Sequence, residues 1–294
     1  MLSTFRSFTG LDVKEFDSLY GEVESRYDEK ERRADGGHPF KLSLRNRLLM
    51  LLVYYRLYVT SRLVSFLFDL DHSNVLRDMR MLEPVVREIL PIPQKLHDRV
   101  KKASRPEEVE DYFPGFKAFI DATEQEIPRP KDKRKRKTHY SGKKRRHTVK
   151  TQLTVNKNGL IIHKTNHAHG RRHDYAIFKD SHPSLPKKVR PVVDLGYDGI
   201  QNDYPEMKPI IPFKRRGPGR GHRGANGSEL THSQKRFNKK LSRARVIVEH
   251  TISRVKKFRM MGEEFRNNLK RYDLMTDIVS GLVNLRILGT TATI

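Results

Sequence analysis

The sequence contains no cysteine and no tryptophan. Without cysteine the chain cannot form disulfides, use a thiol nucleophile or bind a metal through thiolates. Long apolar runs are also missing: the run from Leu48 to Tyr58 is interrupted by Arg56 and is far shorter than the roughly 20 residues of a membrane-spanning helix. The first residues lack the apolar stretch of a signal peptide. We therefore expect a cytoplasmic protein with no membrane partner.

Negative charge is scarce relative to positive charge. The chain has 60 Lys and Arg against 35 Asp and Glu, a formal net charge of +25. The first 120 residues are nearly balanced, so almost all of the excess lies beyond them, concentrated in residues 125–150 and 206–261. One such tract is also typical of a solvated face. Two tracts around a set of carboxylates favour a polyanion such as nucleic acid, because each neutralised phosphate releases counterions.

The N-terminal region, residues 1–40, predicts an amphipathic helix from Leu11 to Arg33. Apolar side chains recur at helical spacing on one stripe, and the rest of the segment is strongly charged; the stripe consists of Phe16, Leu19, Tyr20, Val23 and Tyr27. A helix of this kind docks or dimerises, so we expect a homodimer. A breaker follows at residues 36–39.

Residues 41–100 predict a helix-turn-helix domain. Ser43 can cap a buried helix, Thr60 can cap a short helix that ends near Phe68, and a turn leads into a helix over residues 73–86. Pro91, Pro93 and the polar residues 101–111 indicate a linker.

The second helix of this pair carries Asn74, Arg77 and Arg80 on its outer face. Asparagine and arginine read adenine and guanine edges in the major groove. This pattern predicts sequence-specific contact with double-stranded DNA, although any three-helix packing unit can also expose polar residues.

From residue 113 the pattern changes to that of an α/β domain. Residues 117–122, 147–155 and 160–166 predict a meander of strands, with a hairpin turn at residues 156–159. A helix over 173–180, a strand over 191–194 and a final strand over 209–213 follow.

Three acids stand at notable places in this domain: Asp121 inside an apolar strand, Asp194 at the end of another, and Glu249 on an amphipathic helix over 241–258. Arg245 and Lys256 share a face of that helix with Glu249. Any single acid is more commonly a cap or a surface residue. Together, carboxylates in a cysteine-free, basic domain suit two hard cations, Mg²⁺ or Mn²⁺, and phosphoryl chemistry.

Six ordered segments carry a resemblance to a known family. FIDATEQEI, YSGKKRRHTVKTQ, GRRHDYAIF, VVDLGYDG, PIIPFKR and LSRARVIVEHTISRVKKFRMM resemble DDE transposases of the insertion-sequence-five group and their Harbinger relatives. The resemblance covers roughly residues 113–289. It implies a ribonuclease-H-like catalytic domain over 113–294, Mg²⁺-dependent cleavage at terminal inverted repeats, transfer of the 3′ ends to target DNA, and a prokaryotic, nucleoid-associated protein.

The resemblance also implies roles for single residues. Asp121, Asp194 and Glu249 take the places of the catalytic, metal-binding acids, and Arg245 and Lys256 match residues that orient the glutamate and contact DNA. Ser242 stands where a related signature has Tyr. Asp174 is a rival for the second acid, although a cap or structural partner is the simpler interpretation.

Other polar residues are assigned to DNA contact. Lys143 and Lys144 are expected at the phosphate backbone, and glycines 217, 219 and 221 in a loop over DNA. The spacing of His163, His167 and His169 is typical of a strand near DNA, with a metal cluster that also includes His173 as the alternative.

The leading hypothesis is therefore a cut-and-paste transposase. A catalytically silent, transposase-derived DNA-binding protein and a host nuclease that cuts without joining are the alternatives.

Overall fold

The computed structural model describes residues 2–27, 39–215 and 229–291. The expected breaker at 36–38 and the glycine loop at 217–221 lie outside these residues. The helices are α1 (Leu2–Thr9), α2 (Val13–Arg26), α3 (Leu44–Leu57), α4 (Ser61–Leu67), α5 (His72–Ile89), α6 (Pro93–Lys102), α7 (Pro106–Tyr112), α8 (Lys133–His139), α9 (Asp174–Ser181), α10 (Ile200–Asp203), α11 (His232–Lys256), α12 (Arg259–Gly262) and α13 (Tyr272–Thr291). The strands are β1 (Lys117–Glu126), β2 (Tyr140–Ser141), β3 (Arg146–Val155), β4 (Ile161–Lys164), β5 (Ala168–His169) and β6 (Arg190–Val192).

The helix-turn-helix predicted from the sequence is present as α4 and α5. Thr60 accepts the Leu63 N–H and begins α4, and Asp71 accepts the Ser73 N–H and begins α5. Ser43 caps α3 as expected. These short oxygen-bearing side chains satisfy backbone donors that the first helical turn leaves open. Local chemistry therefore sets where each of these helices begins.

The apolar stripe of the N-terminal helix is buried within its own chain. Helix α2 begins at a capping box between Asp12 and Glu15, and Phe16, Leu19 and Val23 join the main core with residues of α3, α5 and α13. A second copy therefore cannot use this stripe, and the reason for expecting dimerisation through it was wrong. The neighbouring α1 was not predicted.

The expected linker is also wrong, because the chain forms two helices there. Pro93 and Pro106 begin α6 and α7 at first-turn positions, where proline's missing N–H costs nothing. Their buried side chains pack against the sheet in one apolar cluster, which contains Leu96, Val100, Val109, Phe113, Ala118, Leu160, Ile162 and Val189. The passage from the helix-turn-helix to the sheet is thus a packed structure.

The sheet is mixed, as expected of a ribonuclease-H-like domain. Its main path runs β2-β3-β1-β6, and β4 and β5 also pair with β3. Strands β1 and β3 are antiparallel over eight residue pairs, whereas β6 runs parallel to β1. The predicted last strand over 209–213 is reduced to one bridge between Ile210 and Val192.

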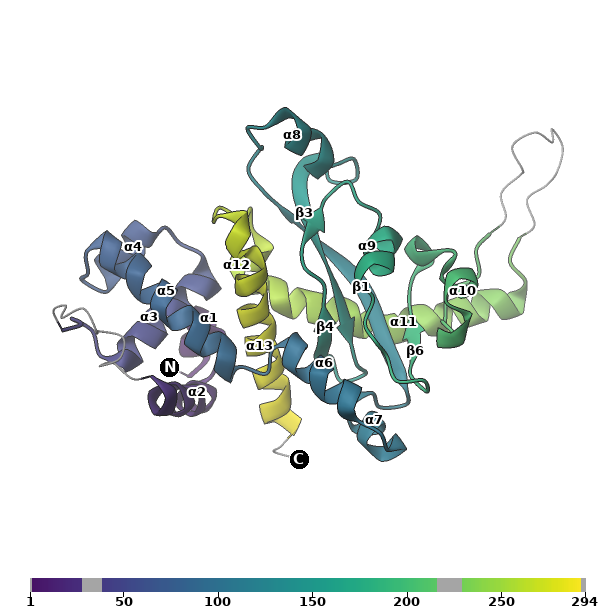
Figure 1. Cartoon of the computed structure of the whole chain (residues 1–294), viewed down its shortest axis with the longest axis horizontal. Coiled ribbons are helices and arrows are strands. Elements are labelled where there is room, and N and C mark those ends of the chain that lie inside the picture. Colours follow the sequence, from purple (N-terminus) through teal and green to yellow (C-terminus); the bar gives the residue numbers. More distant parts are fainter. Residues whose placement is uncertain (1, 28–38, 216–228, 292–294) are drawn as a thin grey trace.

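Helices cover both faces of this sheet (Figure 1). Side chains on β1 alternate between the faces: Ala118 packs with α6 and α7, Phe119 with the core that includes α11, and Ile120 with α9 and α10. Helix α11 begins at His232, nine residues before the expected start, at a capping box formed by Thr231 and Gln234. Residues of α11 and of strand ends can therefore meet on one face.

Helix α13 joins the helical region to the sheet (Figure 1). Every residue from Met275 to Asn284 is buried, and the helix contacts α2 and α5 on one side and α6 and α11 on others. Gly281 permits this packing, since a Cβ there would lie 2.8 Å from the Leu90 Cβ. Asn284 links three backbone groups: it accepts the Ile161 N–H and donates to the Ile161 and Pro91 carbonyls.

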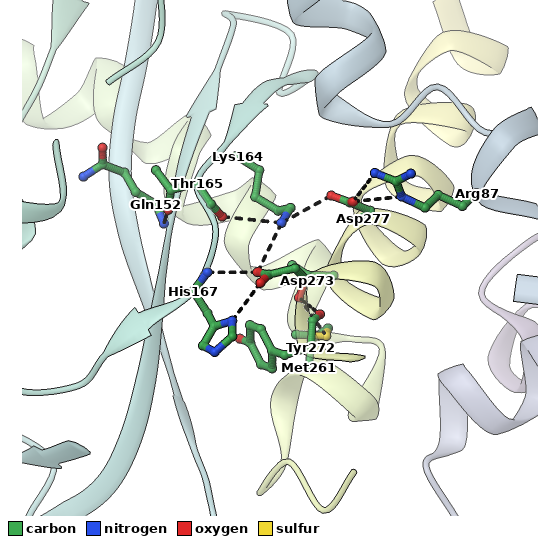
Figure 2. Close-up of polar contacts among 10 residues, drawn as sticks. Arg87, Gln152, Lys164, Thr165, His167, Met261, Tyr272, Asp273 and Asp277 are labelled. Atoms are coloured by element: carbon green, nitrogen blue, oxygen red, sulfur yellow. Dashed lines mark hydrogen bonds and ion pairs between the residues drawn. The ribbon is translucent and has the colours of Figure 1, made fainter. Parts of the chain in front are cut away.

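A chain of alternating charges runs along the same contact (Figure 2). Arg87 of α5 donates to Asp277 at 3.0 Å, and Lys164 of β4 lies 3.2 Å from Asp277 and 3.6 Å from Asp273. The backbone N–H of His167 donates to Asp273 at 2.9 Å. Opposite charges in a partly buried chain compensate one another's desolvation.

Among the residues that the structure describes, no helix combines the length and the apolar character that a membrane span requires.

The core of the helix-turn-helix region contains a buried ion pair. Arg47 is fully buried, its Nε lies 3.3 Å from Asp78 Oδ2, and it donates to the Tyr27 hydroxyl at 2.9 Å. Removing one member of a buried pair leaves the other charge uncompensated, at a cost of about 3–5 kcal/mol. We predict that Asp78→Ala lowers the free energy of unfolding in urea by about that amount.

The control is Asp17→Ala, which removes the exposed ion pair with Arg45. Exposed pairs contribute about 0–1 kcal/mol, so this variant should unfold close to the wild-type urea midpoint. Equal losses in both variants would show that the buried pair has no special role.

Candidate active site and nucleic-acid interface

Asp121 lies in the middle of β1, on the face covered by α11. It is two residues after Phe119 and shares that residue's face, and its carboxylate accepts the Ala122 N–H at 2.8 Å. The side chain is only 20% exposed. Burial raises the pKa of Asp121 to about 6; the Arg245 guanidinium opposes this rise, and the negative charge of Asp194 adds to it.

Asp194 follows β6, the strand that pairs with β1 in parallel. Its carboxylate accepts the Gly196 N–H at 2.7 Å and begins the short helix η2 (Leu195–Tyr197). Because β1 and β6 are adjacent, the two aspartates reach the same edge of the site. Asp194 is 39% exposed, so it faces solvent more than Asp121 does.

Arg245 of α11 lies between these two carboxylates. Its Nη2 is 3.5 Å from Asp121 Oδ2 and 3.7 Å from Asp194 Oδ2, and the side chain is 13% exposed. The buried Nε has no hydrogen-bond partner within the described residues. One cation thus compensates two acids. This differs from the expectation that Arg245 orients Glu249.

Glu249 is one helical turn beyond Arg245 and on the same flank, as the spacing predicted. It is exposed. Its carboxylate forms no hydrogen bond or ion pair with the residues that the structure describes. These residues also contain no group of three acids or histidines arranged to hold a metal. The structure therefore brings Asp121 and Asp194 together and leaves Glu249 outside the pair.

Asp174, the rival second acid, begins α9 and is paired with Lys150 of β3 at 3.0 Å. The same Lys150 donates to the Arg172 carbonyl. Asp174 is close enough to add to the raised pKa of Asp121, as the weakest of the contributions to it. Its own cationic partner is typical of a structural acid.

Helix α5 presents the three expected side chains to solvent. Asn74, Arg77 and Arg80 are exposed on α5, whereas Val75, Met79 and Leu82 are buried beneath them. The predicted division of this helix into an inner and an outer face is confirmed.

The described residues of the chain match two family models. Residues 120–284 match the DDE superfamily endonuclease, and residues 40–92 match the helix-turn-helix of DDE superfamily endonucleases. The chain belongs to the DDE superfamily of endonucleases.

This DDE endonuclease also has a similar curated relative. It is 28% identical over 285 residues to a probable transposase for insertion sequence element IS702 of Microchaete diplosiphon, covering 96% of this chain and 94% of the relative. No solved structure matches the chain significantly.

Lysines from two parts of the chain are found near the C-terminal end of α11. Lys143 and Lys144 are exposed in the turn between β2 and β3, and Lys256 is exposed in the last turn of α11. Neighbouring protein atoms partly desolvate the ammonium group of Lys256, although the residue as a whole is exposed, and this lowers its pKa; the positive charge of Lys144 lowers it further. Lys144 and Lys256 therefore lie on one surface, which suits contact with a phosphate backbone.

The histidines do not form one group. His163 is partly buried and packs against the ring of His97, with 4.8 Å between ring centroids; desolvation lowers its pKa to about 3. His167 binds Asp273 and His169 contacts His139. The packing of His163 against His97 favours a structural role for it, and contact of the other histidines with DNA stays a prediction.

Two polar residues near the acids were given no role by the sequence, although both lie in segments that carry the family resemblance. The buried Gln152 of β3 donates to the Tyr197 hydroxyl at 2.7 Å and to the Asp174 carbonyl at 3.3 Å. The bond to Tyr197 fixes the segment after Asp194 against the sheet. It joins residues that are far apart in the sequence, so it becomes visible only in the folded structure.

The raised pKa of Asp121 predicts a pH-dependent cost to stability. The folded protein holds the Asp121 proton up to about pH 6, whereas the unfolded chain releases it near 3.8. Stability is therefore lost as pH rises between these values, by at most about 3 kcal/mol. In EDTA, Asp121→Asn should unfold at higher urea than wild type at about pH 7.5, and the difference should shrink at about pH 4.

The matched control is Glu22→Gln, which neutralises an exposed carboxylate of α2. Its small effect should not change with pH over this range. A wild-type advantage over Asp121→Asn at pH 7.5 would contradict the assignment of Asp121 as a buried, strained carboxylate.

Proposed function

We propose that the chain is the transposase of an insertion sequence: the helix-turn-helix binds the terminal inverted repeats, and the DDE domain cleaves the DNA and joins the freed 3′ ends to a target. One observation carries this proposal. Strands β1 and β6 bring Asp121 and Asp194 to the guanidinium of Arg245. The chain belongs to a family of endonucleases, and its helix α5 exposes side chains of the kinds that read bases.

The pair of carboxylates fits a divalent cation. Their oxygens are the hard donors that Mg²⁺ and Mn²⁺ prefer. Burial raises the pKa of Asp121 and the charge of Asp194 raises it further, so a bound cation would stabilise the ionised pair. Asp121 and Asp194 would hold the ions, with Glu249 as a further ligand. Bound ions activate the attacking oxygen and stabilise the leaving oxygen.

The chain's own residues supply the remainder. Arg245 compensates the charges of the two acids. If cations bound the acids, its guanidinium could pair with a phosphate of the DNA instead. Lys144 and Lys256 neutralise the DNA backbone near the end of α11. Asn74, Arg77 and Arg80 select the sequence.

The isolated position of Glu249 favours one second candidate. A DNA-binding protein that descends from a transposase and no longer cuts would also keep the helix-turn-helix, and needs no assembled third ligand. The two candidates differ in cleavage but agree in binding.

We predict that Asp121→Asn, Asp194→Asn and Glu249→Gln each abolish Mg²⁺-dependent cleavage at the borders of the element while leaving binding to those borders within about twofold. The DNA is a fragment with the gene's own flanking sequence. Glu229→Gln, an exposed acid just before α11, is the control. Specific binding without cleavage by the wild type would favour the silent protein, and cleavage without joining of pre-cut ends would favour a nuclease.

A second prediction concerns sequence reading by α5. Arg77→Ala should weaken binding to the element's ends by about 1–3 kcal/mol and relax the preference at one base pair. Arg99→Ala, an exposed arginine of α6, should leave the preference unchanged. Competition binding with single-base variants of the end measures both, and equal losses on all DNA sequences would make Arg77 a backbone contact.

A further inference from the structure

A small apolar pocket lies directly beside the two acids. Its volume is about 220 Å³, and its wall includes Phe119, Val192, Phe237 and Leu241. Phe119 precedes Asp121 by two residues and Val192 precedes Asp194 by two, so each wall residue shares a strand face with an acid. Along each strand, the Cα of the wall residue is therefore about 7 Å from the Cα of the acid.

Two ammonium groups stand at the rim of this pocket. Lys117 and Lys240 line it and are exposed, and neither forms an ion pair within the described residues. An apolar interior beneath free positive charges is complementary to a ligand with a flat apolar part and an attached anion. A nucleotide has this combination.

One wall residue of the pocket, Phe237, belongs to an exposed aromatic pair with Phe213. Phe237 is 39% and Phe213 45% exposed, and their rings meet edge to face at 5.2 Å. The side chain of Asn238 accepts the Phe213 N–H and donates to the Phe213 carbonyl, each at 2.9 Å. The pair is thus held in place although it is open to solvent, as a stacking surface requires.

We propose that this pocket, the base pocket, receives one nucleobase turned out of the stack of the bound DNA, with its phosphate between Lys117 and Lys240. The volume is below the roughly 300–1,000 Å³ of pockets for larger ligands, which limits the occupant to a single base. An unstacked base next to the acids fixes which phosphate reaches them. The proposal rests on the proposed function and adds a residue-level basis for choosing the cleavage position.

The test uses the full chain in EDTA, with a short DNA strand of abasic nucleotides that carries a single fluorescent aminopurine. A fully abasic strand of the same length is the reference. Wild type should bind the aminopurine strand roughly 5- to 150-fold more tightly, the range of one base stacked on an aromatic ring. The aminopurine emission should shift to shorter wavelength as the base enters apolar surroundings.

Phe237→Ala should reduce this ratio to near one, and Phe237→Leu to an intermediate value. Phe8→Ala, an exposed phenylalanine of α1, should keep the wild-type ratio. Changing Lys117 and Lys240 to Gln should weaken both strands alike and reduce the slope of log affinity against log salt by about 0.7 per lysine.

Equal binding of the two strands by wild type would overturn the base pocket, as would a ratio that survives Phe237→Ala. A pocket that serves a partner protein's apolar side chain predicts that equality. Because the assay contains no divalent ion, its result is independent of cleavage. Failure to cut the element's borders would refute the proposed function and leave the measured base binding in place.

Discussion

The amide of Asn284 is the contact on which the assembly of this chain depends. It bonds both backbone groups of Ile161 at the start of β4 and the Pro91 carbonyl between α5 and α6. The two Ile161 groups are buried and the Pro91 carbonyl is partly buried; a buried group left unpaired costs about 1–3 kcal/mol. The sheet edge and the segment that follows α5 are therefore fixed to the same residue of α13.

This constraint explains why the helical region and the sheet form a continuous core. Residues of α2, α3 and α5 share one apolar cluster with residues of β1, β3 and α11. The charges of Arg87, Asp277 and Lys164 follow the same boundary. This packing gives α5 a defined position relative to Asp121 and Asp194. Under the proposed function, DNA bound at α5 would therefore be presented to the two acids.

The sequence predicted local features well, because they depend on neighbouring residues. The caps at Ser43 and Thr60, the inner and outer faces of α5 and the meander of strands follow from spacing alone. Asp121 was also placed correctly inside a strand, whereas the strand expected to end in Asp194 stops at Val192. The choice of partners could not be predicted: Arg245 was matched with Glu249 by helical spacing, yet the sheet offers it two nearer carboxylates.

The wrong predictions have the same cause. The stripe of α2 indicated an apolar partner but could not identify α13 within the same chain. The polar residues 101–111 suggested a linker because α6 and α7 bury only one narrow side. The middle of α13, residues 275–284, is buried all round, and such a segment lacks the periodicity by which a helix is recognised.

The site beside this core combines features that oppose stability. Two acids share one arginine, the more buried acid has a raised pKa, and an aromatic pair stays exposed close by. Each costs free energy in the isolated protein. In the proposed complex, cations would compensate the two acids and a base would cover Phe237. Binding of metal and DNA would then relieve these features together, which would link the assembly of the site to the presence of its substrate.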